Sequence, residues 1–315
     1  MARIAVTRAL PGPAVERLRA AGHDVDVWPG ELPPPPAALR ELVAPADALL
    51  CLLTDRVDAE LLDAAPRLVA IANYAVGADN IDLGACAARG IPVGVTPGVL
   101  TDATADLALA LLLAAARNLL PAAADARAGR WRTWEPAGWL GLELRGATLA
   151  VVGYGRIGQA VAERARGFGM RVEPVARGDD LHAALRRADA VSLHVPLTEA
   201  TRHLVDADAL AAMKPTAILV NTARGAIVDQ DALVAALRAG TIAAAALDVT
   251  DPEPPAPDDP LLKLPNALVV PHIGSATRAT RARMAAMAAD NLLAALAGET
   301  MPHPAPAGGS QRACS

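Results

Sequence analysis

The chain has 315 residues, of which 53% are hydrophobic and 20% charged, a composition typical of a globular protein rather than a disordered one. Its 29 basic and 34 acidic residues give a net charge of −5, which leaves no positive excess to neutralise nucleic-acid phosphates. Cys51, Cys86 and Cys314 are too few and too scattered for a disulfide framework or a metal cluster. The length favours two domains.

Two further features of the composition bear on location and on the core. The first ten residues lack the apolar run of a signal peptide, and the apolar stretch from Leu107 to Ala116 is shorter than the roughly 20 residues that span a bilayer. We therefore expect a soluble, cytoplasmic protein. Aromatic residues make up only 2% of the chain, so the core must consist of Ala, Val, Leu and Ile.

In the first third of the chain, short aliphatic runs alternate with helical patterns, which is typical of βαβ units around a parallel sheet. The proline cluster from Pro33 to Pro36 predicts a surface loop, because prolines donate no backbone hydrogen bonds to a sheet. Further on, Asp79 or Asn80 is expected to cap a helix that begins at Ile81. The five expected strands cover Arg3 to Thr7, Asp24 to Trp28, Ala48 to Leu53, Leu68 to Ala72 and Pro92 to Val95.

A long apolar pattern then predicts one helix from Asp102 to Leu120. The loop from Gly129 to Trp139 follows it and holds three of the seven aromatic residues in the chain. Because aromatic side chains are enriched at protein interfaces, we expect this helix and loop to join two copies of the chain into a homodimer.

A second βα series starts at Ala147, and its six strands are the complement of a complete dinucleotide-binding domain. A final helix from Thr277 to Leu296 is expected to pack back on the first domain. The tail from Met301 is rich in Pro, Gly and Ser and is expected to fray. The six expected strands cover Thr148 to Val152, Arg171 to Val175, Ala190 to Val195, Ala217 to Asn221, Ala243 to Val249 and Ala267 to Val270.

A glycine-rich turn from Gly153 to Gly158 lies directly between the first of these strands and an amphipathic helix. In a phosphate-binding turn of this pattern, Gly153 permits the tight turn and Gly155 lets the backbone approach a pyrophosphate. Gly158 lets the helix and the strand pack closely. The sequence therefore predicts a dinucleotide site at the N-terminus of that helix.

Polar residues also follow successive strands of the second series, namely His194, Arg224, Asp248, Glu253 and His272. A single arginine, acid or histidine at a strand end is usually a solvated or structural residue. Ligands, however, bind outside the carboxyl ends of parallel strands, so we expect these five side chains to converge on one crevice.

Three segments resemble the signature segments of the D-isomer-specific 2-hydroxyacid dehydrogenases, whose Arg, Glu and His form the active site. They run from Asn221 to Asp229, from Ala246 to Pro254 and from Pro271 to Ser275. The segment from Val76 to Asp82 fits as well, so the resemblance covers nearly the whole chain. Within the family, the chain is most similar to the glyoxylate and hydroxypyruvate reductases. The segments that are close to this branch are Cys51 to Asp55, Thr96 to Asp106 and Trp131 to Pro136.

The resemblance implies an α/β fold of two doubly wound parallel-sheet domains, in which a Rossmann-type cofactor domain is inserted into a flavodoxin-like substrate domain. The active site would lie in the cleft where they meet. The substrate domain would comprise residues 1–98 and a returning helix at 278–297, the cofactor domain 99–277 and the tail 298–315.

The implied chemistry is the reduction of a small 2-oxo acid to the D-2-hydroxy acid with NAD(P)H. Arg224 would bind the substrate carboxylate with its planar fork of donors, and His272 would donate the proton. Glu253 would hydrogen-bond His272 and favour its imidazolium form. The backbone N–H groups at Val76 and Gly77 would be a second anchor for the carboxylate. No residue has the spacing of a metal site, and this chemistry requires none.

The same resemblance implies the cofactor site. In NAD-using members the second strand of the cofactor domain ends in an Asp that binds the adenosine ribose, and Ala176 stands at that position here. Arg177 beside it can pair with a 2′-phosphate, so we expect NADPH rather than NADH, unless Glu173 or Asp179 takes that place. Asp248 would hold the nicotinamide carboxamide. The expected cofactor-binding residues are Thr104, Gly153, Tyr154, Gly155, Arg156, Ile157, Gly158, Ala176, Arg177, His194, Val195, Pro196, Thr201, Thr222, Ala223, Arg224, Asp248, His272 and Gly274.

Three other functions stay open. D-3-phosphoglycerate dehydrogenases often carry a C-terminal regulatory domain, which this chain is too short to hold. Phosphite dehydrogenases typically have a lysine near the carboxylate-binding loop, where this chain has no lysine between Val76 and Asp79. NAD(H)-sensing corepressors of the same family retain the Arg, Glu and His, so only turnover separates them from an enzyme. The pocket wall at Leu52, Leu53 and Trp139 has no charge that identifies the substrate.

Overall fold

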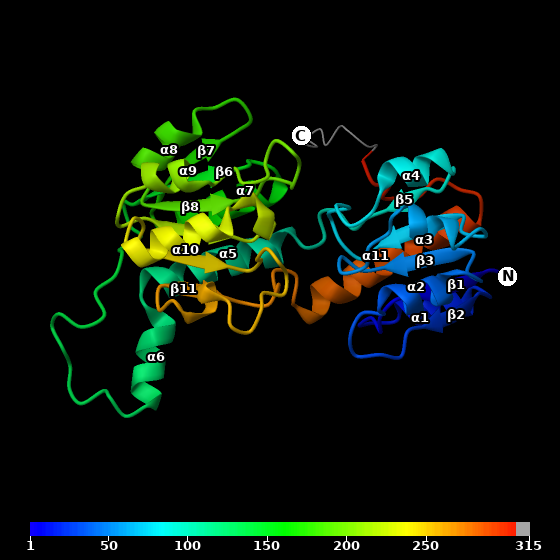
Figure 1. Cartoon of the computed structure of the whole chain (residues 1–315), viewed down its shortest axis with the longest axis horizontal. Coiled ribbons are helices and arrows are strands. Elements are labelled where there is room, and N and C mark those ends of the chain that lie inside the picture. Colours follow the sequence, from blue (N-terminus) through cyan, green and yellow to red (C-terminus); the bar gives the residue numbers. More distant parts are fainter. Residues whose placement is uncertain (307–315) are drawn as a thin grey trace. The chain divides into compact units, whose positions relative to one another are not determined.

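The computed structural model describes residues 1–306, which form two compact units, each built around its own parallel sheet (Figure 1). The first unit contains residues 1–100 and 276–306, and the second contains residues 101–275. The expected fold class, two doubly wound parallel-sheet α/β domains with one inserted into the other, is confirmed.

The first unit is a five-stranded sheet with helices packed on it. Its elements are β1 (Arg3–Val6), α1 (Ala14–Ala20), β2 (Asp24–Val27), α2 (Pro36–Val43), β3 (Ala48–Cys51), α3 (Ala59–Asp63), β4 (Ala70–Asn73), α4 (Leu83–Ala88), β5 (Val93–Gly94) and α11 (Arg278–Leu296). The strand order is β2-β1-β3-β4-β5, the flavodoxin-like order, and α11 packs against α1, β3 and β4. Consecutive residues Leu49 and Leu50 belong to two different buried clusters, because successive side chains of a strand point to opposite faces.

The helix that follows β4 begins later than expected. Asp82 accepts a hydrogen bond from the Ala85 N–H at 2.8 Å, so it caps α4, whose first residue is Leu83. The expected cap at Asp79 or Asn80 is therefore wrong. The Asn80 side chain instead bonds to two backbone carbonyls of the loop after β3.

The proline cluster from Pro33 to Pro36 is only partly a surface loop. Pro34 is buried, and Pro36 is the first residue of α2. Proline suits the first position of a helix because the N–H that it lacks would have no partner there.

Residues 301–306 pack on the first unit, so the expected fraying of the tail is wrong for this part. The Met301 side chain is buried. The Val95 N–H donates to the His303 carbonyl at 2.9 Å, and the Ala305 N–H donates to the Val93 carbonyl at 2.7 Å. These bonds pair the tail with β5, which would otherwise present an open sheet edge. Residues 307–315 lie outside the described part of the chain.

The second unit is a six-stranded sheet, and all six expected strands are present. Its elements are α5 (Thr101–Ala116), α6 (Leu119–Arg127), β6 (Thr148–Val152), α7 (Arg156–Gly167), β7 (Arg171–Val175), α8 (Leu181–Arg187), β8 (Ala190–Leu193), α9 (Ala207–Ala212), β9 (Ile218–Asn221), η1 (Gly225–Ile227), α10 (Gln230–Ala239), β10 (Ala244–Leu247), η2 (Pro260–Lys263) and β11 (Ala267–Val269). The order is β11-β10-β9-β8-β6-β7. Strand β7 is added on one side of β6 and β8 on the other, so the strand order reverses between β6 and β8, which is where ligands bind in such sheets. Within the described residues β7 is an edge strand, which suits Pro174 because proline cannot donate to a further strand.

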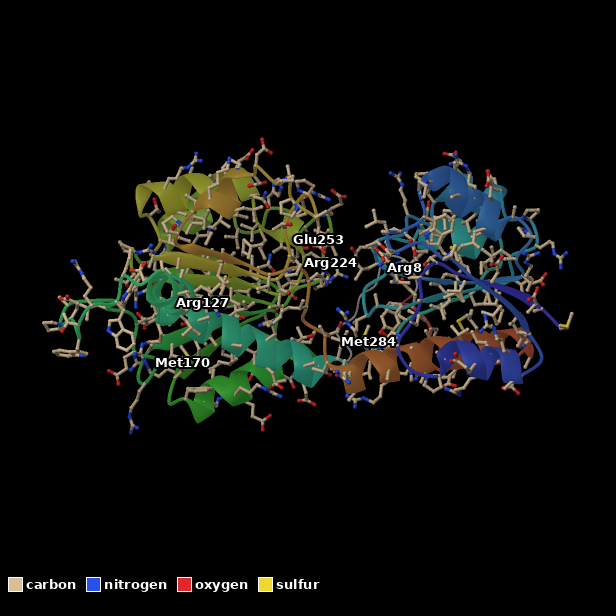
Figure 2. All side chains as sticks on the ribbon, turned by 90° about the horizontal axis from the view of Figure 1, so that it is seen from below. Arg8, Arg127, Met170, Arg224, Glu253 and Met284 are labelled. Atoms are coloured by element: carbon tan, nitrogen blue, oxygen red, sulfur yellow. The ribbon has the colours of Figure 1, made fainter. Side chains whose placement is uncertain are left out.

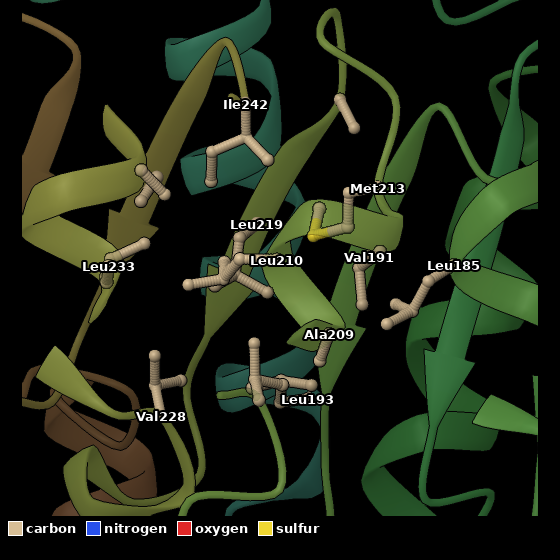
Figure 3. Close-up of a cluster of buried hydrophobic side chains, with 14 of the residues drawn as sticks. Leu185, Val191, Leu193, Ala209, Leu210, Met213, Leu219, Val228, Leu233 and Ile242 are labelled. Atoms are coloured by element: carbon tan, nitrogen blue, oxygen red, sulfur yellow. The ribbon is translucent and has the colours of Figure 1, made fainter. Parts of the chain in front are cut away.

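Aliphatic side chains fill the core of this unit, as the low aromatic content requires. Figure 3 shows the cluster around Leu185, Val191, Leu193, Leu210 and Leu219, which come from β8, β9 and the adjacent helices. Burial of one such side chain contributes about 1.5–3 kcal/mol. A packed core of this kind fixes the ends of the central strands, from which the site residues extend.

The expected single helix from Asp102 to Leu120 is wrong. α5 ends at Ala116, and α6 runs at 63° to it. Asn118 at the break has a φ of +50°, and Pro121 would clash with the carbonyl four residues earlier in a continuous helix. Within residues 1–306 no single helix is long and apolar enough to cross a membrane, and only this bent pair passes such a test jointly.

Three strands, β3, β8 and β10, end two residues earlier than expected, where loops of the site begin. β10 ends at Leu247, directly before Asp248. β3 ends at Cys51 because the Leu52 N–H turns to the Asp55 carboxylate, at 2.7 Å. β8 ends at Leu193, three residues before Pro196, which has no N–H for the sheet.

Candidate active site

The glycine-rich turn between β6 and α7 has the geometry of a phosphate-binding site. Gly153 has a φ of +91°, and a Cβ there would come within 2.7 Å of the His194 backbone. A Cβ at Gly158 would lie 2.1 Å from the Gly153 carbonyl oxygen, so the helix and the strand are in direct contact. A Cβ at Gly155 would meet nothing within 4 Å, and no side chain caps α7. The turn thus offers backbone N–H groups and open space to a pyrophosphate.

A second observation in this unit fits a bound dinucleotide. Thr222 follows β9, and its hydroxyl is buried without a hydrogen-bond partner among residues 1–306. A buried polar group without a partner costs about 1–3 kcal/mol, so a ligand at this strand end would relieve that cost. Other candidate cofactor residues lie in the glycine turn (Tyr154, Arg156, Ile157), after β8 (His194, Val195, Pro196) and after β9 (Ala223).

The remaining candidate cofactor residues of this unit differ in their surroundings. The Thr201 hydroxyl donates to the Pro196 carbonyl at 2.6 Å and so closes its own loop. Thr104 is buried on α5, and a Cβ at Gly274 would lie 3.4 Å from its hydroxyl. Ala176 and Arg177 are exposed directly after β7.

His272 and Glu253 form a close pair at neighbouring strand ends. The His272 Nδ1 donates to the Glu253 Oε1 at 2.6 Å. The side chain of His272 is 25% exposed and that of Glu253 is 32% exposed. Because Nδ1–H is used in this bond, Nε2 carries a proton only in the imidazolium form. Loss of that proton leaves a neutral ring that is still bonded to Glu253. The pair can therefore present and release one proton at Nε2.

Asp248 holds the turn that contains His272. The His272 backbone has a φ of +50°, which is uncommon for a residue with a side chain. The two carboxylate oxygens of Asp248 accept hydrogen bonds from the Ile273 N–H at 2.6 Å and the Gly274 N–H at 2.8 Å, and its carbonyl accepts from the His272 N–H at 3.0 Å. Burial raises the pKa of Asp248, opposed by the Ile273 N–H and by the charge of His272. The sequence alone gave no sign of this holding role.

Arg224 follows β9 and lies in a loop that other residues fix. The Asn221 side chain donates to the Arg224 carbonyl at 2.8 Å and accepts from the Ala223 N–H at 3.0 Å. A Cβ at Gly225 would lie 1.9 Å from the Thr250 carbonyl oxygen, so the Arg224 loop touches the loop that leads to Glu253. Figure 2 shows Arg224 and Glu253 at the same end of this unit. Sequence reasoning missed Gly225, because its contact is made by a residue 25 positions away.

His194 is a different kind of histidine from His272. Its Nε2 lies 2.8 Å from the Ser192 hydroxyl, and no carboxylate accepts from it. Burial lowers the pKa of His194 to about 4, so the ring is neutral at working pH. A neutral ring beside the Gly153 turn can support that turn without adding charge next to it.

The other two candidate substrate residues, Val76 and Gly77, lie in the first unit, in the loop after β4. The side chain of Val76 is 38% exposed. The N–H groups of residues 76 to 78 donate to no group among residues 1–306. Consecutive free N–H groups of this kind can bind an anion.

Comparisons with known proteins agree with this geometry. Residues 109–274 match the model of the D-isomer specific 2-hydroxyacid dehydrogenase NAD binding domain. This chain belongs to the D-isomer-specific 2-hydroxyacid dehydrogenase family. It is therefore an NAD(P)-dependent oxidoreductase that binds a nicotinamide cofactor, as the sequence predicted.

Relatives over the whole chain support the same assignment. The glyoxylate reductase of Korarchaeum cryptofilum is 49% identical, over 96% of this chain and 95% of that protein. A crystal structure from Thermus thermophilus is 54% identical, with a TM-score of 0.92 over 96% of this chain and 100% of the other. An NADPH-dependent glyoxylate/hydroxypyruvate reductase of Sinorhizobium meliloti, solved with NADP and malonate, is 34% identical, with a TM-score of 0.85 over 96% of each chain.

Proposed function

We propose that this dehydrogenase reduces glyoxylate to glycolate and hydroxypyruvate to the D-2-hydroxy acid, D-glycerate, with NADPH as the preferred cofactor. The observation that carries the proposal is the His272–Glu253 pair beside the Arg224 loop, at the carboxyl ends of β9, β10 and β11. The identity to glyoxylate reductases supports the choice of substrate.

In this mechanism each residue has one task. The bound reduced nicotinamide supplies a hydride to the substrate carbonyl carbon. Arg224 binds the substrate carboxylate through two parallel N–H donors, and the free backbone N–H groups near Val76 and Gly77 bind the same carboxylate. His272 donates the Nε2 proton to the carbonyl oxygen as negative charge develops there. Glu253 keeps the ring oriented through its hydrogen bond with Nδ1–H.

The cofactor site of the proposal involves the loops around the dinucleotide. The glycine turn and the first turn of α7 would hold the pyrophosphate, and the unpartnered Thr222 hydroxyl would be a further hydrogen-bond donor to the cofactor. Asp248 holds the His272 turn and binds the nicotinamide carboxamide. The first unit, residues 1–100 with 276–306, serves as the substrate domain.

A turnover assay tests the proposal. Purified protein is mixed with NADPH and one of three 2-oxo acids, namely glyoxylate, hydroxypyruvate or 3-phosphohydroxypyruvate. In a separate assay it is mixed with NADP and phosphite. The nicotinamide absorbance is followed in each case. We expect glyoxylate and hydroxypyruvate to give the highest kcat/KM. Preference for the phosphorylated acid or for phosphite would replace the proposed substrate. Tight binding of the nucleotide without any turnover would indicate a nucleotide-sensing protein instead.

The preference for NADPH rests on the residues after β7. Glu173 lies inside the strand and pairs with Arg187, so it is not free to bind a ribose. Arg177 is exposed and has no carboxylate within 4 Å, whereas the Asp179 carboxylate accepts from the Ala176 N–H at 2.7 Å. Arg177 can therefore bind a 2′-phosphate in charge-assisted hydrogen bonds.

Kinetics with both cofactors test this preference. We expect a higher kcat/KM for NADPH than for NADH, and Arg177→Gln should lower it for NADPH alone. Asp179→Asn is the matched variant and should leave the NADPH preference intact or increase it. A native preference for NADH would instead assign the ribose to Asp179.

We also propose a homodimer that forms through α6 and the loop after it. No residue of α6 is buried, and both Trp131 and Trp134 are more than three-quarters exposed. Figure 1 shows this helix and loop projecting from the rest of the second unit. Exposed aromatic residues on a projecting segment are typical of an interface. Analytical ultracentrifugation at micromolar concentration should give a dimer, and a monomer would refute the proposal.

A further inference from the structure

Two asparagine side chains hold the loop after β4 from its buried side. Asn73 is the last residue of β4 and is fully buried. Its Nδ2 donates to the Gly77 carbonyl at 2.9 Å and to the Asn80 Oδ1 at 2.9 Å. One carboxamide thus bonds both the middle and the end of the loop.

Asn80 joins this loop to the neighbouring one. Its Nδ2 donates to the Leu52 carbonyl at 3.0 Å and to the Asp55 carbonyl at 2.9 Å, and its own carbonyl accepts from the Val57 N–H at 2.9 Å. The loops after β3 and β4 are therefore held as one piece by the Asn80 side chain together with the backbone bonds at Val57. Asp55 is itself fixed, because its carboxylate accepts from the Thr7 hydroxyl at 2.5 Å.

These bonds determine where the free N–H groups of the loop point. In a trans peptide the C=O and N–H groups point in opposite directions. The Gly77 carbonyl points inward to the buried Asn73 amide, so the N–H of the same peptide, which belongs to Ala78, points outward. That N–H donates to no group among residues 1–306. The loop is held with a donor directed away from the core.

We propose that Asn73 and Asn80 are positioning residues that orient the Gly77–Ala78 peptide toward the substrate carboxylate. The inference rests on the proposed function, and it adds two residues that do not touch the substrate. Only a carboxamide can do both parts of the task. Asn73 must donate to two oxygens at once, and Asn80 must accept from Asn73 while it donates to Leu52 and Asp55.

Asn73→Asp is the sharpest variant. A carboxylate cannot donate, so its oxygens would face the Gly77 carbonyl and the Asn80 Oδ1 with no hydrogen between them. We expect the Gly77–Ala78 peptide to rotate, so that its N–H points inward and donates to the carboxylate. The outward group would then be a carbonyl, which repels the substrate carboxylate. We expect the KM for glyoxylate to rise 10- to 100-fold, the scale of one hydrogen bond to a charged group. The kcat and the KM for NADPH should change less than about threefold, because binding is lost uniformly.

Asn80→Ala is the second variant, because Asn73→Asp places a charge in the core and can fail to fold. It should raise the same KM about 10-fold. Asn266→Ala is the matched control, since Asn266 also donates to two backbone carbonyls, those of Leu237 and Ala243, but in the other unit. We expect it to lower the melting temperature without changing the KM for glyoxylate.

Oxalate binding in the presence of NADPH, followed by calorimetry, separates this inference from the proposed function. Oxalate has the carboxylate of a 2-oxo acid but cannot be reduced, so its affinity is measured even if glyoxylate is not the substrate. We expect Asn80→Ala to weaken oxalate binding at least 10-fold relative to the wild type and to Asn266→Ala. Wild-type oxalate affinity in Asn80→Ala would overturn the positioning role. A wild-type protein that binds oxalate but does not reduce glyoxylate would overturn the substrate alone.

Discussion

The carboxyl edges of the two sheets present different parts of the chain. In the second unit the strand ends carry Arg224, Glu253 and His272, the side chains to which we assign the chemistry. In the first unit the loop after β4 presents backbone N–H groups, and its polar side chains, Asn73 and Asn80, are turned inward to hold it. The two edges share one sheet architecture but differ in what faces the ligand.

This difference predicts how each edge fails. An edge that acts through side chains loses its chemistry when one functional group is removed. An edge that acts through the backbone has no such group, so it fails only when its supports change the direction of a peptide. Substitutions that disturb the loop after β4 in the first unit should therefore change substrate affinity, and substitution of His272 in the second unit should change the rate.

His272→Ala should break the second edge most strongly. Loss of a general acid lowers turnover roughly 10²- to 10⁴-fold, and we expect kcat for glyoxylate to fall by that amount while NADPH still binds. Steady-state kinetics and NADPH fluorescence measure the two effects. His182→Ala, on α8 of the same unit, is the matched control and should retain wild-type kcat. Wild-type activity in His272→Ala would remove this histidine from the mechanism.

Gly225→Ala tests whether the second edge also depends on a close backbone approach. The added Cβ would lie 1.9 Å from the Thr250 carbonyl oxygen, so the loops that carry Arg224 and Glu253 must separate. We expect kcat/KM to fall about 10-fold or more and the melting temperature to drop by several degrees. Gly167→Ala is the control, because a Cβ there meets nothing within 4 Å and alanine is favoured in a helix. Equal kinetics in the two variants would contradict the contact.

The comparison also explains what the sequence could predict. The six strands of the second unit, the glycine turn and the residues at the strand ends were predictable, because alternation of strands and helices and the identity of polar residues are visible in the sequence. The site in the first unit was predictable only by resemblance, because the direction of a peptide group depends on bonds between Asn73, Gly77 and Asn80. The same limit explains why the sequence wrongly predicts a helix cap at Asn80. An asparagine before a helix is a good cap unless its side chain is hydrogen-bonded to carbonyls elsewhere in the fold, as Asn80 is to Leu52 and Asp55.

The other errors have similar causes. The break between α5 and α6 depends on the conformation of Asn118, and the packing of residues 301–306 depends on the open edge of β5. Neither a backbone dihedral nor an unpaired strand edge can be seen in a local pattern of residues. Tertiary contacts decided both.

Glu253→Ala should lower the rate less than loss of His272 itself. The Glu253 Oε1 accepts from the His272 Nδ1–H at 2.6 Å, so the substitution leaves the ring without the partner that orients it. We expect kcat for glyoxylate to fall about 10-fold or more. Glu253→Gln should retain more activity, because an amide oxygen can still accept from Nδ1–H. Wild-type kcat in Glu253→Ala would argue against the pairing, and Glu299→Gln, far along the chain from this pair, is the control that should keep wild-type kcat.

His194→Gln should have the smallest effect, and on stability rather than rate. Burial lowers the pKa of His194 to about 4 in the folded chain, whereas the unfolded chain has the ordinary value of about 6.5. Between these values the unfolded state binds a proton that the folded state does not, so the native protein loses stability as the pH falls from about 6.5 to 4. The loss attributable to this residue is of the order of 3 kcal/mol, and glutamine, which does not titrate, should remove it. Thermal unfolding of the cofactor-free protein at pH 7 and at pH 4.5 tests this difference. The melting temperature of the wild type should fall several degrees more than that of His194→Gln, and parallel declines would show that the ring is protonated in the folded state.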